Sequence, residues 1–469
     1  MARDRTGAPH GWCSFRARPD AGSERWPTSH WCVRLCPVAE PIVVVESREH
    51  LWYLLTEASQ VEHMIMCQYL YATFSLKGGV NEDLTDAQAA AVGRWRGRLH
   101  DIAVDEMLHL ALVANVMAAI GAAPTVGRPN FPQRSGYFPP SVQLDLLPFG
   151  EAALTHFLYL ERPEGMERVD AEGFVPMAPP HEPLSPDELL PRVQDFATVG
   201  HLYRGIANGL SHLVERFGER AVFVGAKQAQ TRPDLLHWPE LIAVTDLDSA
   251  HAAIEEIIDQ GEGARGDWRS AHYGRFLDIW SEFHELQAAD PTFDPARPVQ
   301  AAFVKQPYDV VAAQTLVTNP AARAVAELFN LGYEAILQTL TRLFTHTDET
   351  DDQLKTLAGA AIGLMAGVLS PLGSVLTGMP LGAEHPGRTT GPAFEMYYAM
   401  GNFVPWRESA WAVLAERVRV LADRCDAVTS SGDVPDAIGR VAVTARAIAG
   451  DLAVDVPPEL LAKDSPPRA

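Results

Sequence analysis

Cysteine is scarce in this sequence, with five residues in a chain of 469. The spacing of the five matches no disulfide framework, and Cys67 and Cys425 fall within predicted helices. Reduced thiols are therefore favoured over disulfides, as in a cytoplasmic protein. Cys32 and Cys36 have no second pair beside them, which disfavours a zinc site there.

Positive charge is also in short supply. The chain has 38 Lys and Arg against 60 Asp and Glu, for a formal net charge of −22. A solvated acidic surface explains this balance, which disfavours binding to nucleic acid or to anionic membranes.

The first 40 residues lack the apolar segment of a secretory signal. We expect residues 1–41 to be a poorly ordered extension and the protein to be cytoplasmic.

Long uncharged runs are rare, and only the one from Leu357 to Ala383 is long enough to suggest a membrane span. It contains Pro371, Pro380 and many glycines. Both residue types disfavour a continuous helix. We predict a buried helix that ends near Ser370, followed by a tight apolar loop, and no membrane partner.

Internal repeats, heptads and a series of alternating strands are absent, and helical periodicity dominates. Ala289–Pro298 is the clearest linker because it combines several Pro and Asp residues, which favour turns. We therefore predict an all-α protein: a four-helix bundle over 42–290, a linker over 291–319, a helical C-terminal region over 320–455 and a flexible tail over 456–469. The predicted helices cover residues 48–76, 95–120, 150–161, 191–217, 246–261, 270–286, 321–344, 353–370, 409–425 and 434–452.

An acid and an imidazole interrupt the apolar stripe of the second helix. Glu106 and His109 fall in the series that contains Ile102 and Val113. Burying an unpaired carboxylate costs several kcal/mol, so it needs a partner. The two side chains could form a hydrogen-bonded core pair, or they could bind one metal ion, since positions i and i+3 are neighbours on a helix. Glu-x-x-His is the ligand pattern of di-iron and di-manganese bundles.

Other helices carry further candidates. Glu62 lies in the apolar stripe of the first helix, either as a ligand or as a tolerated acid at its edge. Glu262 lies beside the apolar face of the fourth helix, where a solvated turn acid is the alternative. His272 follows the break in that helix, and a core histidine is the alternative. The third helix has no acid on its apolar side, so His201 binds metal only if the opposite side faces the bundle centre.

These segments resemble the ferritin-like domain of the iminophenyl-pyruvate dimer synthase family, whose members act in violacein- and rebeccamycin-type biosynthesis. The resemblance covers roughly residues 42–425. It is most specific in "IAVDEMLHLALVANVMAAIGAAP" (102–124), with "EHMIMCQYLYATFSL" (62–76), "PFGEAALTHFLYLERPEG" (148–165) and "PGRTTGPAFE" (386–395) in support.

The resemblance implies a ferritin-like four-helix bundle and a set of metal ligands. It also points to position 201, where relatives carry an acid and this chain has a histidine. That exchange lowers the negative charge of the site and favours a mononuclear site or a different metal over the usual dinuclear carboxylate site. The implied ligands are Glu62, Glu106, His109, His201, Glu262 and His272.

Carboxylate and imidazole ligands suit Fe(II) and oxygen chemistry. We predict an iron-dependent oxidase or oxygenase that acts on a small amino-acid-derived amine or imine in secondary metabolism. The iron is mono- or dinuclear, manganese is the alternative metal, and molecular oxygen is the co-substrate. Tyr69, Tyr203, His385 and Arg388 are the predicted substrate contacts, with ordinary core or surface roles as alternatives.

Two other functions stay open at this stage. One is a catalytically inactive helical partner of a biosynthetic complex, and the other is a metal-binding protein without a substrate. A homodimer and complexes with other biosynthetic enzymes are both compatible with the sequence.

Overall fold

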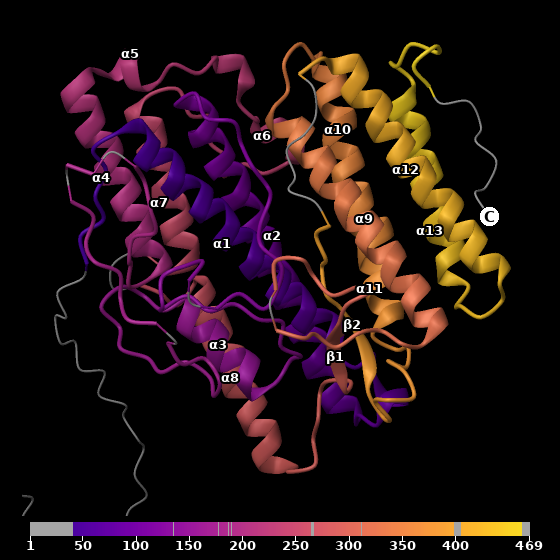
Figure 1. Ribbon diagram of the computed structural model, residues 1–469. Helices are drawn as coiled ribbons and strands as arrows, with labels where there is room; N and C mark the ends of the chain where they lie inside the picture. The colour runs from indigo at the N-terminus through magenta and orange to yellow at the C-terminus, as the bar shows by residue number, and fades with distance from the viewer. Residues whose placement is uncertain are drawn as a thin grey trace, which may run out of the picture.

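The computed structural model describes residues 41–461 except residues 135, 177, 186, 189, 264–266, 311 and 398–404. The predicted N-terminal extension and most of the predicted tail lie outside these residues, as do Cys13, Cys32 and Cys36. In the described part, Cys67 and Cys425 are free and buried. Helices dominate and form two groups that lie side by side, indigo to magenta and orange to yellow (Figure 1).

The first group begins with two long helices, α1 (Arg48–Ser75) and α2 (Asp86–Ala119). Each has a side-chain cap at its N-terminus, from Ser47 and from the capping box of Thr85 and Gln88. The capping box explains why α2 begins before the predicted start at Trp95. Reciprocal hydrogen bonds fix the first turn, and the Ala-rich segment that follows favours helix without an apolar stripe.

Four helices form the predicted bundle. In it, α1, α2, α4 (Val199–Phe217) and α7 (Leu247–Gly261) form a closed ring in which each helix packs against two others. The prediction of a ferritin-like four-helix bundle is thereby confirmed. Helix α4 begins later than predicted because Thr198 is its N-cap and accepts a hydrogen bond from the His201 N–H.

The fourth bundle helix is broken, as the sequence predicted. Helix α8 (His272–Ala289) follows α7 after a loop, and it packs against α2 and α3 (Glu151–Leu160). The break places the first residue of α8 inside the bundle, which matters for the site described below. Short helical turns connect these elements: η1 (Val80–Glu82), α5 (Glu219–Val222), η2 (Lys227–Ala229) and α6 (Pro233–Leu236).

The predicted linker contains a strand that joins the two groups. Strand β1 (Val299–Ala302) pairs in parallel with β2 (Thr389–Pro392), with Val299 opposite Thr389. Neither strand alternates between buried and exposed residues, so the period that reveals a strand in a sequence is missing. Both strands lie below the gap between the two groups of helices (Figure 1).

The second group is the predicted helical C-terminal region. The helix that was predicted to end near Ser370 continues beyond that residue. The chain stays helical from Asp351 to Leu376, and a π-helical turn over Met365–Leu369 precedes Pro371. A wider turn accommodates a proline, which has no N–H to donate. The elements are α9 (Pro320–Phe344), α10 (Asp351–Leu364), η3 (Met365–Leu369), α11 (Ser370–Leu376), α12 (Arg407–Ser430) and α13 (Ala437–Ala453).

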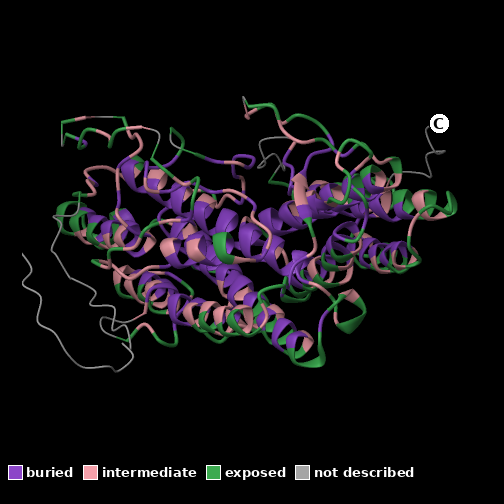
Figure 2. Ribbon diagram, turned by 90° about the horizontal axis from the view of Figure 1, so that it is seen from below, coloured by how far each residue is buried: buried purple, intermediate pink, exposed green. Residues whose placement is uncertain are grey.

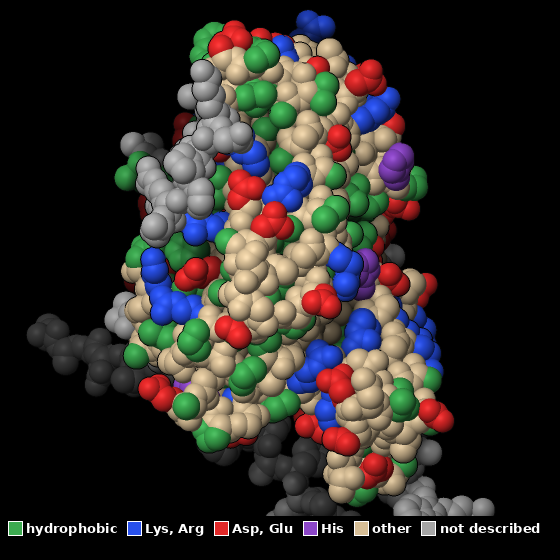
Figure 3. Space-filling view, turned by 90° about the vertical axis from the view of Figure 1, so that its right-hand side faces the viewer, with side chains coloured by type: hydrophobic (Ala, Val, Ile, Leu, Met, Phe, Trp, Pro, Cys, Tyr) green, Lys and Arg blue, Asp and Glu red, His purple; other side chains and the backbone are tan. Residues whose placement is uncertain are grey.

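Among the residues that the structure describes, two helices are long and apolar enough to cross a membrane: α2 and the continuous helix Asp351–Leu376. The apolar window of α2 is 83% buried inside the protein, so its composition is that of a core helix. The window of the second is 44% buried, which leaves apolar side chains at the surface. Buried residues run through the centre of both groups (Figure 2), and acidic, basic and hydrophobic side chains are interspersed on the face shown in Figure 3.

Candidate metal centre

Polar ionisable side chains from four elements meet in the core of the bundle. Each is at most 6% exposed to solvent. Burial of this degree is unusual for charged groups unless they are paired or bind an ion. The five are Glu62 of α1, Glu106 and His109 of α2, Glu161 directly after α3, and His272 at the start of α8.

Among the described residues, these side chains form two groups that could each hold one metal ion. Glu62, Glu106 and His109 make the first group; Glu106, Glu161 and His272 make the second. Within each group, one ligand atom per residue lies within 4.8 Å of the others. Glu106 belongs to both groups. Its Oε2 is 3.0 Å from Nδ1 of His109, and its Oε1 is 3.0 Å from Nδ1 of His272.

The two imidazoles are oriented by acceptors on their far sides. Nε2 of His109 faces Oε1 of Gln260 at 3.1 Å, and Gln260 itself is oriented because its Nε2 donates to Glu256. Nε2 of His272 faces a carboxylate oxygen of Asp105 at 3.3 Å. When Nε2 carries the proton, Nδ1 of each imidazole can direct a lone pair at the carboxylates. A carboxylate oxygen and an Nδ1 lone pair that face each other need a proton or a metal ion between them.

The chemistry of this donor set fits a metal ion. Nδ1 of His272 is buried and has no hydrogen-bond partner of good geometry. A cavity of about 20 Å³ lies beside the carboxylates of Glu62, Glu106 and Glu161. Oxygen and imidazole donors without thiolate suit iron, manganese or zinc. Three buried carboxylates also need more positive charge than hydrogen bonds supply.

The pKa shifts show how the site behaves when protons take the place of the cation. Burial raises the pKa of Glu62 to about 7, assisted by the charge of Glu106. Burial alone would lower the pKa of His109, but Glu106 and Glu62 outweigh it and raise that pKa to about 10. Burial would also lower the pKa of His272, but Glu106, Asp105 and Glu161 outweigh it and raise that pKa. A metal ion must displace these protons, so metal binding and protonation compete.

Two tyrosines that were predicted to contact substrate donate hydrogen bonds to the carboxylates. The hydroxyl of Tyr203 donates to Oε1 of Glu62 at 2.6 Å, and the hydroxyl of Tyr69 donates to Oε1 of Glu161. Both tyrosines are buried, and Tyr203 also lines the cavity. Because one oxygen of each carboxylate is engaged, the other is directed towards the ligand groups.

The structure does not bring Glu262 into either ligand group. Its carboxylate accepts hydrogen bonds from the N–H of Gly200 at 2.8 Å and of Glu164 at 3.2 Å, and from Nη2 of Arg204 at 3.0 Å. Burial raises the pKa of Glu262, and these donors act against that rise. The N-terminus of α4 therefore holds this carboxylate as helix N-termini hold anions. Glu262 therefore lines the cavity and forms part of its wall.

His201 is likewise outside both groups. It lies in the first turn of α4, and its Nδ1 accepts a hydrogen bond from the N–H of Ala197 at 3.0 Å. Burial lowers the pKa of the ring. The side chain stabilises the entry to α4, so the exchange of an acid for histidine at this position does not reach the ligand groups.

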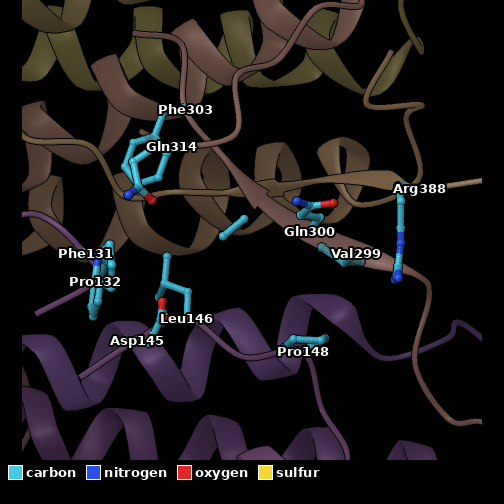
Figure 4. Close-up of a pocket in the computed structure, with 11 residues that line it drawn as sticks. Phe131, Pro132, Asp145, Leu146, Pro148, Val299, Gln300, Phe303, Gln314 and Arg388 are labelled. Carbon is cyan, nitrogen blue, oxygen red and sulfur yellow. Dashed lines mark hydrogen bonds between the residues drawn. The ribbon is translucent and has the colours of Figure 1, made fainter. Parts of the chain in front are cut away.

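His385 and Arg388 lie in the loop before β2 and do not line the metal cavity. Arg388 instead lines a separate pocket of about 400 Å³. Figure 4 shows Arg388 beside Val299 and Gln300 of β1, at the opposite end of this pocket from Phe131. Of these two predicted substrate contacts, neither lines the metal cavity.

Sequence reasoning missed Glu161. The residue ends the apolar segment that contains Phe157 and Leu158, and it lies four positions after Phe157 on the buried face of α3. That spacing is the same signal that identified Glu106. It was overlooked because the helix is short and the acid follows its last turn.

Comparison with known proteins agrees with this geometry. Residues 55–281 match the protein-family model described as Ferritin-like. These residues form a ferritin-like domain. All five clustered residues lie within these bounds. The four helices of the ring also lie within them, except for the first residues of α1.

Two curated relatives confirm the resemblance found in the sequence. Dichlorochromopyrrolate synthase of Lentzea aerocolonigenes is 29% identical over 446 residues, 86% of this chain and 42% of its own. 2-Imino-3-(indol-3-yl)propanoate dimerase of Chromobacterium violaceum is 27% identical over 365 residues, 74% of this chain and 34% of its own. The chain thus spans less than half the length of either relative.

A solved structure is also similar. A ferritin-like protein from Caulobacter vibrioides, at 1.95 Å resolution, shares 18% identity over 68% of this chain and 95% of its own, with a TM-score of 0.42. A likeness at this level supports no conclusion about function.

Proposed function

We propose that this protein is a metal-dependent biosynthetic enzyme that oxidises a small imine- or amine-bearing carboxylate. The observation that supports this most strongly is Glu106, whose two oxygens face two different imidazoles at 3.0 Å. A carboxylate in that position suits two metal ions that share it, as in dinuclear ferritin-like bundles.

The chain's own residues would hold the metal as follows. Glu62 and His109 would hold one ion and Glu161 and His272 a second, and Glu106 belongs to both ligand groups. Iron bound there would supply oxidation chemistry with molecular oxygen as co-substrate, and manganese is the alternative. Gln260 and Asp105 contact Nε2 of the two histidines and so keep each Nδ1 directed at the carboxylate of Glu106.

The cavity also restricts what can react. Its volume is about 20 Å³, enough for one or two water-sized groups. Val199, Ile257 and Ile258 contribute apolar side chains to its lining. Only the reacting end of a substrate fits without movement of α4 or α7, while the remainder of the substrate stays outside the ligand groups.

The substrate class comes from the names of the relatives, which refer to chromopyrrolate and to an imino-indolylpropanoate. An aryl imino carboxylate is named in the second relative and in the family that the sequence resembles. The proposal is limited to oxidation of such a compound, because the chain spans less than half of either relative.

Metal content tests the site. Protein supplied with Fe(II) or Mn(II) is purified, and bound metal is counted by mass spectrometry. We expect about two ions per chain in the wild type, about one in His109→Ala and in His272→Ala, and nearly none in Glu106→Ala. Loss of Glu106, which belongs to both ligand groups, should abolish binding of both ions, whereas loss of either histidine should abolish binding of one.

Glu57→Gln is the matched control. Glu57 is also a buried glutamate of α1, at 4% exposure, but it belongs to neither ligand group. It should retain two ions. Equal metal loss in Glu57→Gln and Glu106→Ala would mean that the bundle, not the ligand set, was damaged. No metal in the wild type would favour the catalytically inactive helical partner instead.

Oxygen uptake tests the reaction. Metal-loaded protein receives 2-imino-3-(indol-3-yl)propanoate generated in solution, and an oxygen electrode follows consumption. Uptake should depend on substrate, be retained in Glu57→Gln and be absent in Glu106→Ala. Metal binding without any uptake would favour the metal-binding protein without a substrate.

A further inference from the structure

A large cleft lies between the two groups of helices, on the other side of α1 from the metal centre. Its volume is about 930 Å³. The cleft is lined from α1 by Met66, Cys67 and Phe74, whereas Glu62 and Ile65 of the same helix line the metal cavity. The two spaces are therefore on different faces of α1.

The lining of the cleft is mostly apolar and adaptable. Met66, Met107 and Met365 contribute flexible thioethers, and Phe74, Trp238 and Phe394 contribute aromatic rings. Protein interiors leave few voids larger than a water molecule, so a cleft of this size is not a packing defect. Its volume lies within the range of small-molecule pockets.

The exposed apolar side of the helix Asp351–Leu376 forms one wall. Ile362 is 41% exposed and Ala366 is exposed, and both line the cleft. The π-helical turn Met365–Leu369 lies in the same wall. Such turns are common at binding sites because they alter the direction of the helix surface.

The charge of the lining is opposite to that of the protein. The chain has 60 acidic and 38 basic residues, yet none of the described residues that line the cleft is acidic. The charged side chains in the lining are Arg96 and Arg297, with His100 near Arg96 on α2. An anionic ligand would meet no repelling carboxylate there.

Both arginines lie at one end of the cleft, beside the C-terminus of α1. Arg96 donates through Nη2 to the carbonyls of Leu76 and Lys77, at 3.1 and 2.8 Å. Arg297 donates to both oxygens of Glu82, at 2.7 and 3.0 Å. Glu82 pairs with Arg297, whereas these two acceptors of Arg96 are neutral carbonyls, which leaves a positive charge at this end.

A further cation lies behind the inner wall. Tyr333 and Cys67 line the cleft, and Nε of Arg128 donates to the Tyr333 hydroxyl at 3.0 Å. Arg128 is 7% exposed, and no carboxylate pairs with it among the described residues. Its charge is uncompensated, and it adds to the positive potential of the cleft.

We propose that this cleft binds an aromatic carboxylate, with the anionic group at Arg96 and Arg297 and the rings among the methionine and aromatic side chains. The opposite end, lined by Leu110, Leu236 and Trp238, is apolar and suits the rings. The site needs no metal and is independent of the function proposed for the metal centre.

The test uses two probes that share an aromatic body. 8-Anilinonaphthalene-1-sulfonate is an anion, and N-phenyl-1-naphthylamine is its uncharged counterpart. Fluorescence titration of the full chain should show one saturable site per chain for the anion. The absence of a saturable site would overturn the proposal.

Ala366→Trp fills the cleft from its exposed wall and should weaken binding of both probes at least about tenfold. Ala427→Trp, on an exposed position of α12, is the matched control and should bind like the wild type. Unchanged affinity in Ala366→Trp, with circular dichroism showing a folded chain, would overturn the site.

Arg96→Gln tests the charge. A hydrogen bond to a charged group contributes about a factor of ten or more. The anion should therefore bind about tenfold more weakly, whereas the uncharged probe should bind as before. An equal effect on both probes would overturn the assignment of an anionic ligand.

Two measurements separate a ligand site in the cleft from effects of the metal centre and from a dimer interface. Glu106→Ala removes the shared residue of the metal centre and should leave probe binding unchanged, so failure of one proposal does not imply failure of the other. Sedimentation velocity distinguishes a ligand site from an interface between two copies. A wild-type dimer that Ala366→Trp dissociates would overturn the ligand site.

Discussion

Glu106 is the one residue that belongs to both ligand groups of the site. Both of its oxygens face imidazole nitrogens, and it is 2% exposed. Burial would raise the pKa of its carboxyl, but His109 and His272 outweigh burial and lower it. The residue therefore keeps its negative charge inside the bundle, and two positively charged partners, either imidazolium or metal, compensate it.

Tyr203 is predicted to tune metal affinity through Glu62. Tyr203→Phe removes the hydrogen bond that orients the carboxylate and should weaken metal binding about tenfold, the usual effect of such a second partner. Competition with a fluorescent chelator measures the affinity. Tyr333→Phe is the control, because it also removes a buried tyrosine hydroxyl but lies outside the metal site. Equal losses in the two variants would contradict the orienting role.

The buried carboxyl group of Glu57 should make the stability of the fold depend on pH, independently of metal binding. Both of its oxygens are buried without a hydrogen-bond partner, and burial raises its pKa to about 8. In the unfolded chain it loses its proton near about pH 4.3, so the folded state binds more protons between these values. Stability from this group is therefore full at low pH and is lost as the pH rises towards 8.

Glu57→Gln should accordingly gain stability relative to wild type as the pH rises from about 5 to about 8.5, by at most roughly 5 kcal/mol. Urea unfolding at both pH values measures the change. Glu416→Gln, at an exposed position of α12, should show no such trend. A pH-independent difference between Glu57→Gln and wild type would refute the raised pKa.

Single residues also show what the sequence can predict of such a site. Glu62, Glu106, His109 and His272 were found because each interrupts an apolar helical stripe, and the structure brings all four together. Glu262 gave the same signal for a different reason, because it is held by the N-terminus of a helix distant in sequence. Which backbone amides a buried carboxylate will meet depends on tertiary packing and is not encoded in local spacing.

At the level of helices, the contact between α4 and the loop after α7 shapes the wall of the metal cavity. A Cβ atom at Gly200 would lie 2.4 Å from the Glu262 carboxyl group. Only glycine therefore allows the carboxylate to approach the N-terminus of α4. The close approach of the helix end to this carboxylate therefore depends on Gly200.

Gly200→Ala should destabilise the protein by about 1–3 kcal/mol, because the added methyl displaces a held carboxylate. Gly450→Ala in α13 is the comparison. Nothing lies within 4 Å of a Cβ there, so the better helix propensity of alanine should stabilise the protein by about 0.5–1 kcal/mol. Thermal unfolding measures both. Changes of the same sign would refute the steric account.

The helices themselves were predictable, but several ends were not. Helix α2 begins at a capping box that precedes its apolar stripe, and α4 begins at Val199, capped by Thr198, after a Pro-containing irregular segment. The periodicity of apolar residues indicates which face of a helix is buried, whereas hydrogen bonds to the N-cap residue determine where the helix begins. The strands β1 and β2 were missed because each is short and neither alternates.

In the molecule as a whole, two helical groups share α1 and α2 as a common wall. The metal centre lies on one face of this wall and the apolar cleft on the other. Neither the cleft nor its arginines could be predicted, since they arise from how α9 and the helix Asp351–Leu376 pack against the bundle. Long-range packing of this kind leaves no periodic signal in either segment.

Metal should stabilise the whole fold if the ligand groups exist only in the folded chain. Metal at roughly a thousandfold excess over its dissociation constant contributes about 4 kcal/mol. Chelation by EDTA should therefore lower the unfolding temperature of the wild type by several degrees. The unfolding temperature of Glu106→Ala should not respond to EDTA. A similar response in both proteins would place the stabilising metal elsewhere.

The most direct test of the metal centre is a crystal structure of Fe(II)-loaded protein, with anomalous data collected on both sides of the iron absorption edge. We predict two anomalous peaks that share Glu106, one beside Glu62 and His109 and the other beside Glu161 and His272. A single peak would show a mononuclear site. The absence of a peak at Glu106, or a peak at Glu262, would contradict the assignment of this cluster as the metal centre.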